Sequence, residues 1–265
     1  PILFEVGPLQ VRFYSLMYIV GITVGYFLIR GEVRRKDIAL SEDDIMNFIM
    51  WTVLGGIIGA RLYYVIFNWP FYSSNLAEIP AVWHGGLAFH GGLTGGFVGA
   101  YIYLKKLNIP FWRMFDVTAP AIILGQAFGR FGNFMNGDAH GSPTRMPWGI
   151  VFPEGSIAGS DTILRFGENL PLHPVMLYEL AINFSIFLFF WFWLRKKHTK
   201  DGFLSAMYFI LYSIGRTFVE SFRADSLTIG PFRTAQVASL LIIVVTLFSI
   251  VKWRLWEKGN NKTKS

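Results

Sequence analysis

Long apolar runs recur along this chain, and most of its polar residues fall between them. Seven segments are long and apolar enough to cross the roughly 30 Å hydrocarbon core of a bilayer as helices. They cover approximately residues 12–30, 45–67, 87–104, 114–129, 174–194, 203–222 and 234–252. The pattern predicts an all-α, polytopic membrane protein with about seven transmembrane helices and a small external head.

Lysine and arginine are concentrated in alternate connecting segments. Of the 24 cations, 16 follow the first, third, fifth and seventh spans. They are Arg30, Arg34, Arg35, Lys36, Lys105, Lys106, Arg113, Arg195, Lys196, Lys197, Lys200, Lys252, Arg254, Lys258, Lys262 and Lys264. Because cytoplasmic loops carry the excess of cations, the N-terminus is predicted outside and the C-terminus in the cytoplasm. Topology thus accounts for the net charge of +7, and nucleic-acid binding is not expected.

The longest segment between predicted spans covers about residues 130–173 and is rich in proline and glycine. It falls on the external side and is predicted to form the head. We therefore expect one transmembrane domain over residues 1–256 and a polar cytoplasmic tail over 257–265. The chain has no cysteine, which excludes disulfides, cysteine-bound metals and a cysteine nucleophile supplied by the protein. Neither a metal site nor a cofactor is expected.

Glycines recur four residues apart within the predicted second and third spans. The pairs are Gly55 with Gly59, Gly91 with Gly95, and Gly92 with Gly96. Such spacing lets two helices approach closely, because no side chain separates their backbones. Packing within one chain is the favoured interpretation, and dimerisation is the alternative.

Polar side chains within membrane spans are costly, so each cluster of them is a candidate site. The segment 129–141 begins where the fourth predicted span ends and reads Gly-Arg-Phe-Gly-Asn-Phe-Met-Asn-Gly-Asp-Ala-His-Gly. Arg130 offers a planar set of donors suited to phosphate, and Asn133 and Asn136 add neutral donors. A purely structural turn is the alternative.

A second cluster lies on the sixth predicted span. Tyr212, Arg216, Glu220 and Arg223 are spaced by four, four and three residues and so share one helical face. The alternative is a buried Arg216–Glu220 pair that only holds helices together.

Two further candidates lie near the external ends of spans. His90 stands in Phe-His-Gly-Gly at the start of the third span, and Tyr14 stands near the start of the first. A packing histidine and an interfacial aromatic are the respective alternatives. Asp116 and Glu179 also lie within spans, but their spacing does not suggest a proton relay. No metalloprotease, nucleophile-elbow or phosphate-loop motif is present.

The 129–141 segment, together with Phe89-His90-Gly91-Gly92, resembles the prolipoprotein diacylglyceryl transferases of bacteria. The resemblance covers essentially the whole chain. It implies a multi-pass enzyme of the bacterial inner membrane that transfers a diacylglyceryl group from phosphatidylglycerol to the lipobox cysteine of a prolipoprotein signal peptide. The implied partners are therefore phosphatidylglycerol, membrane lipid and the prolipoprotein.

The same resemblance implies a set of site residues. They are Tyr14, His90, Arg130, Asn133, Asn136, Asp138, Gly141, Tyr212, Arg216, Glu220 and Arg223. The family usually has glutamate where this chain has Asp138, so the role of that carboxylate is open. We expect Arg130 and Arg216 to bind the phosphate and His90 to assist thiol deprotonation, with Tyr14 or a polarised water as the alternative base. A lipid or anion transporter and a non-catalytic assembly subunit are the competing functions.

Overall fold

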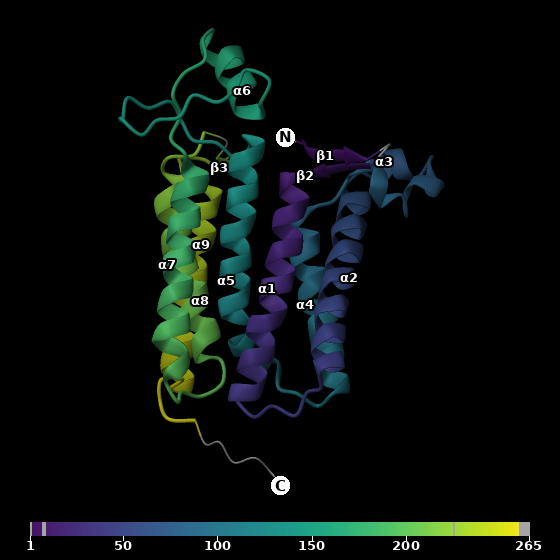
Figure 1. The fold of residues 1–265 in the computed structure, drawn as a ribbon, viewed down its shortest axis with the longest axis vertical. Coiled ribbons are helices and arrows are strands. Elements are labelled where there is room, and N and C mark those ends of the chain that lie inside the picture. The colour runs from purple at the N-terminus through teal and green to yellow at the C-terminus, as the bar shows by residue number, and fades with distance from the viewer. Residues whose placement is uncertain (1, 7–8, 225, 260–265) are drawn as a thin grey trace. The chain divides into compact units, whose positions relative to one another are not determined.

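The computed structural model describes residues 2–6, 9–224 and 226–259, and most of them are helical (Figure 1). The elements in chain order are β1 (Ile2–Val6), β2 (Leu9–Arg12), α1 (Phe13–Arg35), α2 (Glu42–Phe67), α3 (Trp69–Tyr72), η1 (Leu76–Glu78), η2 (Val82–His84), α4 (Phe89–Lys106), α5 (Phe111–Asn136), α6 (Ile157–Phe166), α7 (Val175–Phe192), η3 (Leu194–Lys196), α8 (Phe203–Glu220), β3 (Thr228–Ile229), β4 (Phe232–Arg233) and α9 (Thr234–Trp253). Each of the seven predicted segments lies largely within a helix.

Four of the described helices are long and apolar enough to span a bilayer. They are Ser15–Arg35, Glu42–Phe67, Val175–Lys196 and Thr234–Trp253. The remaining predicted spans correspond to α4, α5 and α8, whose glycines and polar residues make them less apolar. The chain is therefore a helical, multi-pass membrane protein.

The chain divides into two compact units, which are described separately. One comprises residues 29–114 and is called the α2–α4 unit; the other comprises residues 1–28 and 115–265 and is called the α5–α9 unit.

Glycine packing holds the α2–α4 unit together, as the spacing predicted. A Cβ atom added to Gly95 would lie 2.2 Å from the carbonyl oxygen of Gly55 and 2.8 Å from Cα of Gly59. One added to Gly91 would lie 2.4 Å from the carbonyl oxygen of Gly59. In contrast, a Cβ atom at Gly92 would meet nothing closer than 3.5 Å. The face of α4 that carries Gly91 and Gly95 is thus the one that leaves no room for a side chain against α2.

A buried arginine organises the connection between α2 and α4. Arg61 is only 5% exposed and donates hydrogen bonds to five backbone carbonyls of this connection. These belong to Glu78, Ile79, Ala81, Gly85 and Gly86. The guanidinium fork satisfies acceptors that would otherwise be buried without partners, and so it fixes the path of the chain toward α4.

In the α5–α9 unit, a carboxylate of α5 caps α8. Asp116 is buried and accepts hydrogen bonds from the backbone N–H of Gly202 at 2.9 Å and of Ser205 at 2.7 Å. It also accepts one from the hydroxyl of Ser205. Gly202, at the N-cap, has no side chain with which to cap the helix itself. Asp116 supplies the anion that the helix N-terminus favours, and this ties α8 to α5.

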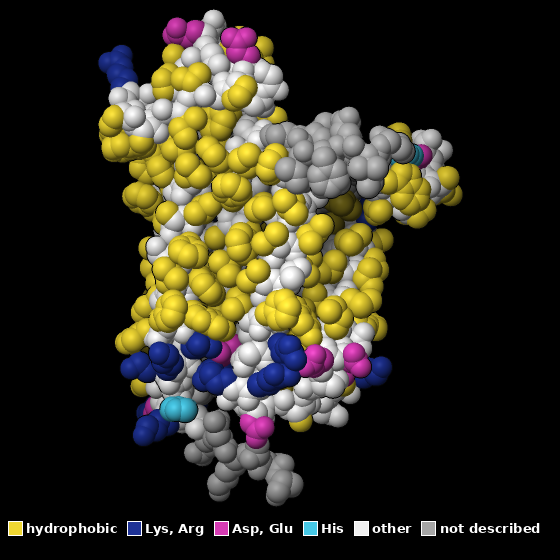
Figure 2. Space-filling view, viewed as in Figure 1, with side chains coloured by type: hydrophobic (Ala, Val, Ile, Leu, Met, Phe, Trp, Pro, Cys, Tyr) yellow, Lys and Arg dark blue, Asp and Glu magenta, His cyan; other side chains and the backbone are white. Residues whose placement is uncertain are grey.

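The outer faces of α7 and α9 are apolar. Large hydrophobic side chains such as Phe184, Phe192, Leu240 and Phe248 are exposed on them. Over α7 and its neighbours, Figure 2 shows hydrophobic side chains along the viewed face, with Lys and Arg gathered at one end. Nζ of Lys200 lies 2.8 Å from Oε2 of Glu257, so the loop after α7 meets the segment after α9. This surface suits a bilayer, with lipid against the helices and the cations at its edge.

The structure adds detail to the sequence predictions in three places. Helix α5 continues to Asn136, where Gly137 with its φ of 65° ends it, so residues 130–136 of the predicted head are helical. Two short antiparallel hairpins, β1–β2 and β3–β4, interrupt the predicted all-α fold. Residues 157–166 of the predicted head form a helix, capped by Ser156 and ended by Gly167.

Candidate active site

Three arginines gather around one buried glutamate near the ends of α5, α7 and α8. Glu179 of α7 is 4% exposed. One of its carboxylate oxygens pairs with Nε of Arg130, and the other pairs with Nη1 of Arg216. Nη1 of Arg223 lies 3.9 Å from the second oxygen. The carboxylate of Glu179 therefore bridges Arg130 and Arg216, the two arginines expected from the sequence to bind a phosphate.

Arg216 also pairs within its own helix. Its Nη2 lies 2.7 Å from Oε2 of Glu220, one turn further along α8. The side chains of Arg130 and Arg216 keep 23% and 20% of their surface exposed, whereas the two glutamates are almost fully buried. The carboxylates thus form the buried side of the cluster, and the arginine side chains form its partly exposed side.

A polar relay links Arg130 to the start of the loop after α5. Nη1 of Arg130 donates to Oδ1 of Asn133 at 3.2 Å, and Nδ2 of Asn133 donates to Oδ1 of Asp138 at 2.8 Å. The spacing of three residues on α5 places Asn133 beside Arg130, and Gly137 turns the chain so that Asp138 returns to Asn133. Asp138 therefore acts on Arg130 through an intermediate side chain.

Gly141 lies where backbones cross. It forms an isolated antiparallel bridge with Arg223, and its N–H donates to the carbonyl of His173 at 3.1 Å. A Cβ atom at this position would lie 2.4 Å from that carbonyl oxygen, so only glycine fits without displacement of the chain. This glycine brings the loop after α5 against the segment that carries Arg223.

His173, whose carbonyl accepts the hydrogen bond from Gly141, was not singled out from the sequence. Its ring packs 5.0 Å from that of Phe222, and its Nδ1 lies 3.1 Å from the hydroxyl of Tyr178. Burial lowers the pKa of His173 below its ordinary value. The folded state therefore favours the neutral ring, and protonation as the pH falls below about 6.5 acts against this packing.

The other predicted site residues are placed as follows. Tyr212 precedes Arg216 by one turn of α8 and stacks on Tyr208, and Asn136 is the last residue of α5. His90 is exposed in the first turn of α4 and belongs to the α2–α4 unit, with its ring 6.4 Å from that of Tyr63. Tyr14 lies in the first turn of α1, and its side chain falls outside the described part of the structure.

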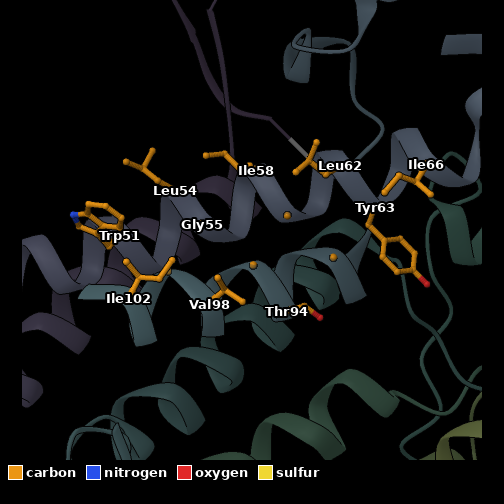
Figure 3. A pocket seen from close by; sticks show the side chains of 14 residues that line it. Trp51, Leu54, Gly55, Ile58, Leu62, Tyr63, Ile66, Thr94, Val98 and Ile102 are labelled. Atoms are coloured by element: carbon orange, nitrogen blue, oxygen red, sulfur yellow. The ribbon is translucent and has the colours of Figure 1, made fainter. Parts of the chain in front are cut away.

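A groove of about 720 Å³ lies between α2 and α4 (Figure 3). Its walls are the glycine faces of both helices and apolar side chains such as Leu54, Ile58 and Val98. None of the residues that line it is charged, so it offers nothing to hold a phosphate. The chemistry of the arginine cluster is therefore separate from this groove.

The sequence indicated Arg130 and Arg216 as site residues but did not indicate Glu179 as the carboxylate that joins them. Glu179 was noted only as a polar residue within a span. A lone acidic residue in an apolar run is itself a signal of function or pairing, but the run cannot reveal which cation it meets. Among the described residues, no three His, Asp or Glu side chains gather to hold a metal ion.

Together, the fold and the cluster define a class: a helical membrane protein in which arginines and buried glutamates gather near the ends of α5, α7 and α8. The comparisons with known proteins identify the family. A family model described as prolipoprotein diacylglyceryl transferase matches residues 1–252, and the chain belongs to this family. The membership expected from the sequence is therefore confirmed.

Three relatives illustrate the similarity, and each is named phosphatidylglycerol–prolipoprotein diacylglyceryl transferase. The protein of Fervidobacterium nodosum is 42% identical over 92% of this chain and 81% of its own length. That of Staphylococcus xylosus is 40% identical over 95% of this chain and 88% of its own. That of Acaryochloris marina is 36% identical over 100% of this chain and 94% of its own.

Proposed function

We propose that this chain transfers the diacylglyceryl group of phosphatidylglycerol to the lipobox cysteine of a prolipoprotein, the first step of lipoprotein maturation in the bacterial inner membrane. The observation that carries the proposal is the pairing of Arg130 and Arg216 through Glu179 in a chain of this family. Two guanidiniums that share one two-oxygen anion are spaced to share another, such as a phosphate.

The reaction requires one bond to form and one to break. The cysteine thiol of the substrate loses its proton to the base, and the thiolate attacks the carbon of the diacylglyceryl group that carries the phosphate. A carbon–sulfur bond forms, the carbon–oxygen bond breaks, and glycerol phosphate leaves with its electrons. Negative charge grows on the phosphate as this bond breaks, so Arg130 and Arg216 stabilise the transition state more than the substrate.

The remaining site residues have supporting roles in this proposal. Asn133 and Asp138 orient Arg130, Glu220 orients Arg216, and Gly141 allows Arg223 to approach the cluster. Asn136 and Tyr212 complete the walls of the head-group site. His90 accepts the thiol proton, with Tyr14 or a polarised water as the alternative base. No metal or cofactor takes part.

The proposal includes a topology. Helices α1, α2, α4, α5, α7, α8 and α9 are the seven spans of a transmembrane domain over residues 1–256, followed by a cytoplasmic tail over 257–265. The N-terminus and the head are outside, and the C-terminus is inside. The head begins after Gly137, where α5 ends, and runs to about residue 173.

Reporter fusions test this orientation. A reporter joined after Lys197 is expected to read cytoplasmic, and one inserted near Gly159 is expected to read external, because 16 of the 24 cations fall on one side of the predicted spans. The measurement is alkaline phosphatase activity beside fluorescence of a cytoplasmic reporter at both sites. Interchanged signals would refute the orientation.

The Asn133–Asp138 relay predicts a graded effect at Asp138. Asp138→Asn is expected to lower turnover about tenfold, because the charge-assisted bond to Asn133 becomes a weaker neutral one and Arg130 is less firmly held. Asp138→Glu keeps the charge and is expected to lose less. The measurement is the initial rate of peptide modification, with Glu168→Gln as the control for loss of a carboxylate in the head. Wild-type rates in both Asp138 variants would contradict the relay.

A direct assay tests the function itself. Purified protein, phosphatidylglycerol and a peptide that contains a lipobox cysteine are expected to yield a peptide whose mass has increased by one diacylglyceryl group, together with free glycerol phosphate. A transporter would instead move lipid or anion across sealed vesicles and leave the peptide unmodified. Absence of peptide modification by active-site-intact protein would refute the proposal.

A further inference from the structure

Glu179 occupies an unusual position for a residue of a phosphate site. Its carboxylate lies between Arg130 and Arg216, the two groups proposed to hold the substrate phosphate, and it is almost fully buried. A carboxylate held at this point by two arginines has two consequences. It orients both guanidiniums before substrate arrives, and it repels any further anion that binds to them.

We propose that Glu179 is a positioning residue that also tunes the charge selectivity of the site, so that the dianionic product leaves more readily than it otherwise would. This inference rests on the proposed function. The substrate phosphate is a diester with one negative charge. The glycerol phosphate that leaves is a monoester, whose second pKa of about 6 gives it two negative charges at pH 8.

The repulsion scales with the charge of the ligand. A fixed carboxylate raises the electrostatic energy of a dianion about twice as much as that of a monoanion at the same place. Glu179 therefore weakens product binding by about the square of the factor by which it weakens substrate binding. The cost in substrate affinity is offset by faster release of product and by guanidiniums that are already oriented for the transition state.

The two proposed roles of Glu179, to orient the arginines and to repel the product, require different properties of its side chain. Holding Arg130 and Arg216 together requires both carboxylate oxygens at the length of a glutamate, since each oxygen pairs with a different arginine. Repelling the product requires only a negative charge nearby. Glutamine removes the charge and keeps the shape, whereas aspartate keeps the charge and shortens the reach by one methylene.

The test compares Glu179→Gln, Glu179→Asp and wild type as purified full-length proteins in detergent. Binding of glycerol phosphate is measured by calorimetry at pH 8 and pH 5, and kcat and KM are measured with short-chain phosphatidylglycerol and a lipobox peptide. Glu257→Gln is the matched control, because it also removes a carboxylate paired with a cation, Lys200, but lies after α9 at the end of the unit where the cations gather. Thermal unfolding is recorded for each protein.

For Glu179→Gln we expect product to bind about 100-fold tighter at pH 8 and short-chain substrate about tenfold tighter, together with a lower kcat. At pH 5 the product carries nearly one negative charge less than at pH 8. The gain in product affinity of Glu179→Gln over wild type is then expected to fall to about tenfold. Glu179→Asp is expected to bind product within about threefold of wild type and still to lose kcat. The control is expected to match wild type in all of these.

A purely structural role for Glu179 predicts otherwise: substrate and product would both bind more weakly in the glutamine variant, in step with a lower unfolding temperature. That result, or equal gains for product at pH 8 and pH 5, would overturn the inference. If the glutamine variant does not fold, the aspartate variant decides, since a loss of product affinity parallel to its loss of kcat would also overturn it. Wild-type protein that leaves the peptide unmodified would instead refute the proposed function.

Discussion

Arg130→Lys and Arg216→Lys are each expected to lower the initial rate of peptide modification by about 100- to 1000-fold. Lysine keeps the positive charge but has a single nitrogen, so it cannot meet a carboxylate and a phosphate with separate donors. Arg216 uses Nη1 toward Glu179 and Nη2 toward Glu220, and Arg130 uses Nε toward Glu179 and Nη1 toward Asn133. The loss is expected in the chemical step, where the leaving phosphate gains charge.

The competing interpretation is that these arginines only hold helices together. The Arg216–Glu220 pair lies within α8, so Arg216 can hold two helices together only through its pairing with Glu179 of α7. Such a role would tolerate lysine, with a modest loss of thermal stability and nearly normal rates. Arg165→Lys is the matched control, because Arg165 pairs with Asp161 at 2.9 Å on the exposed side of α6. Near-wild-type rates in both site variants would return Arg130 and Arg216 to a structural role.

The largest expected effect on stability is that of Gly95→Ala, which should destabilise the protein by about 1–3 kcal/mol. The added methyl would lie 2.2 Å from the carbonyl oxygen of Gly55, a backbone atom that cannot turn aside. Helices α2 and α4 would have to separate, and the close contacts along their glycine faces would be lost. The intrinsic helix preference of alanine over glycine, about 1 kcal/mol, offsets only part of this cost.

Gly92→Ala provides a control on the same helix. A methyl at Gly92 meets nothing closer than 3.5 Å, so its expected effect is neutral or stabilising by up to about 1 kcal/mol. The measurement is the unfolding midpoint of each variant in a mixed-micelle denaturation series, with membrane insertion checked by fractionation. Equal midpoints for the two alanine variants would show that the glycine face of α4 does not control the packing.

Local patterns in the sequence were sufficient to predict the long helices, one contact between helices and one ion pair. Apolar runs located the long helices, four of which can span a bilayer, because the length of such a run is set by the thickness of the bilayer. Glycine spacing identified the contact between α2 and α4, although Gly91 and Gly95 proved to meet the backbone of α2 far more closely than Gly92 does. The interval of four residues placed Glu220 against Arg216, since residues this far apart are neighbours on a helix.

Other features depended on contacts between distant parts of the chain. Glu179 is 37 residues from Arg216 in the sequence, and no periodicity links them. The same holds for Asp116, which caps α8 from α5 across 86 and 89 residues, and for Arg61, which binds five carbonyls of a loop with no sequence signature. Helix α5 also continues to Asn136, past the point where its hydrophobicity ends, although Gly132 and Asn133 are weak helix formers.

The division has a physical reason. Hydrophobic length, helical periodicity and the distribution of cations are properties of single segments in a bilayer, so the amino-acid sequence determined the helices and the arginines available to a phosphate site. The partner of a buried charge is set by which helix faces pack together, and this is a property of the folded chain. The tertiary structure alone decided that Arg130 and Arg216 share the carboxylate of Glu179.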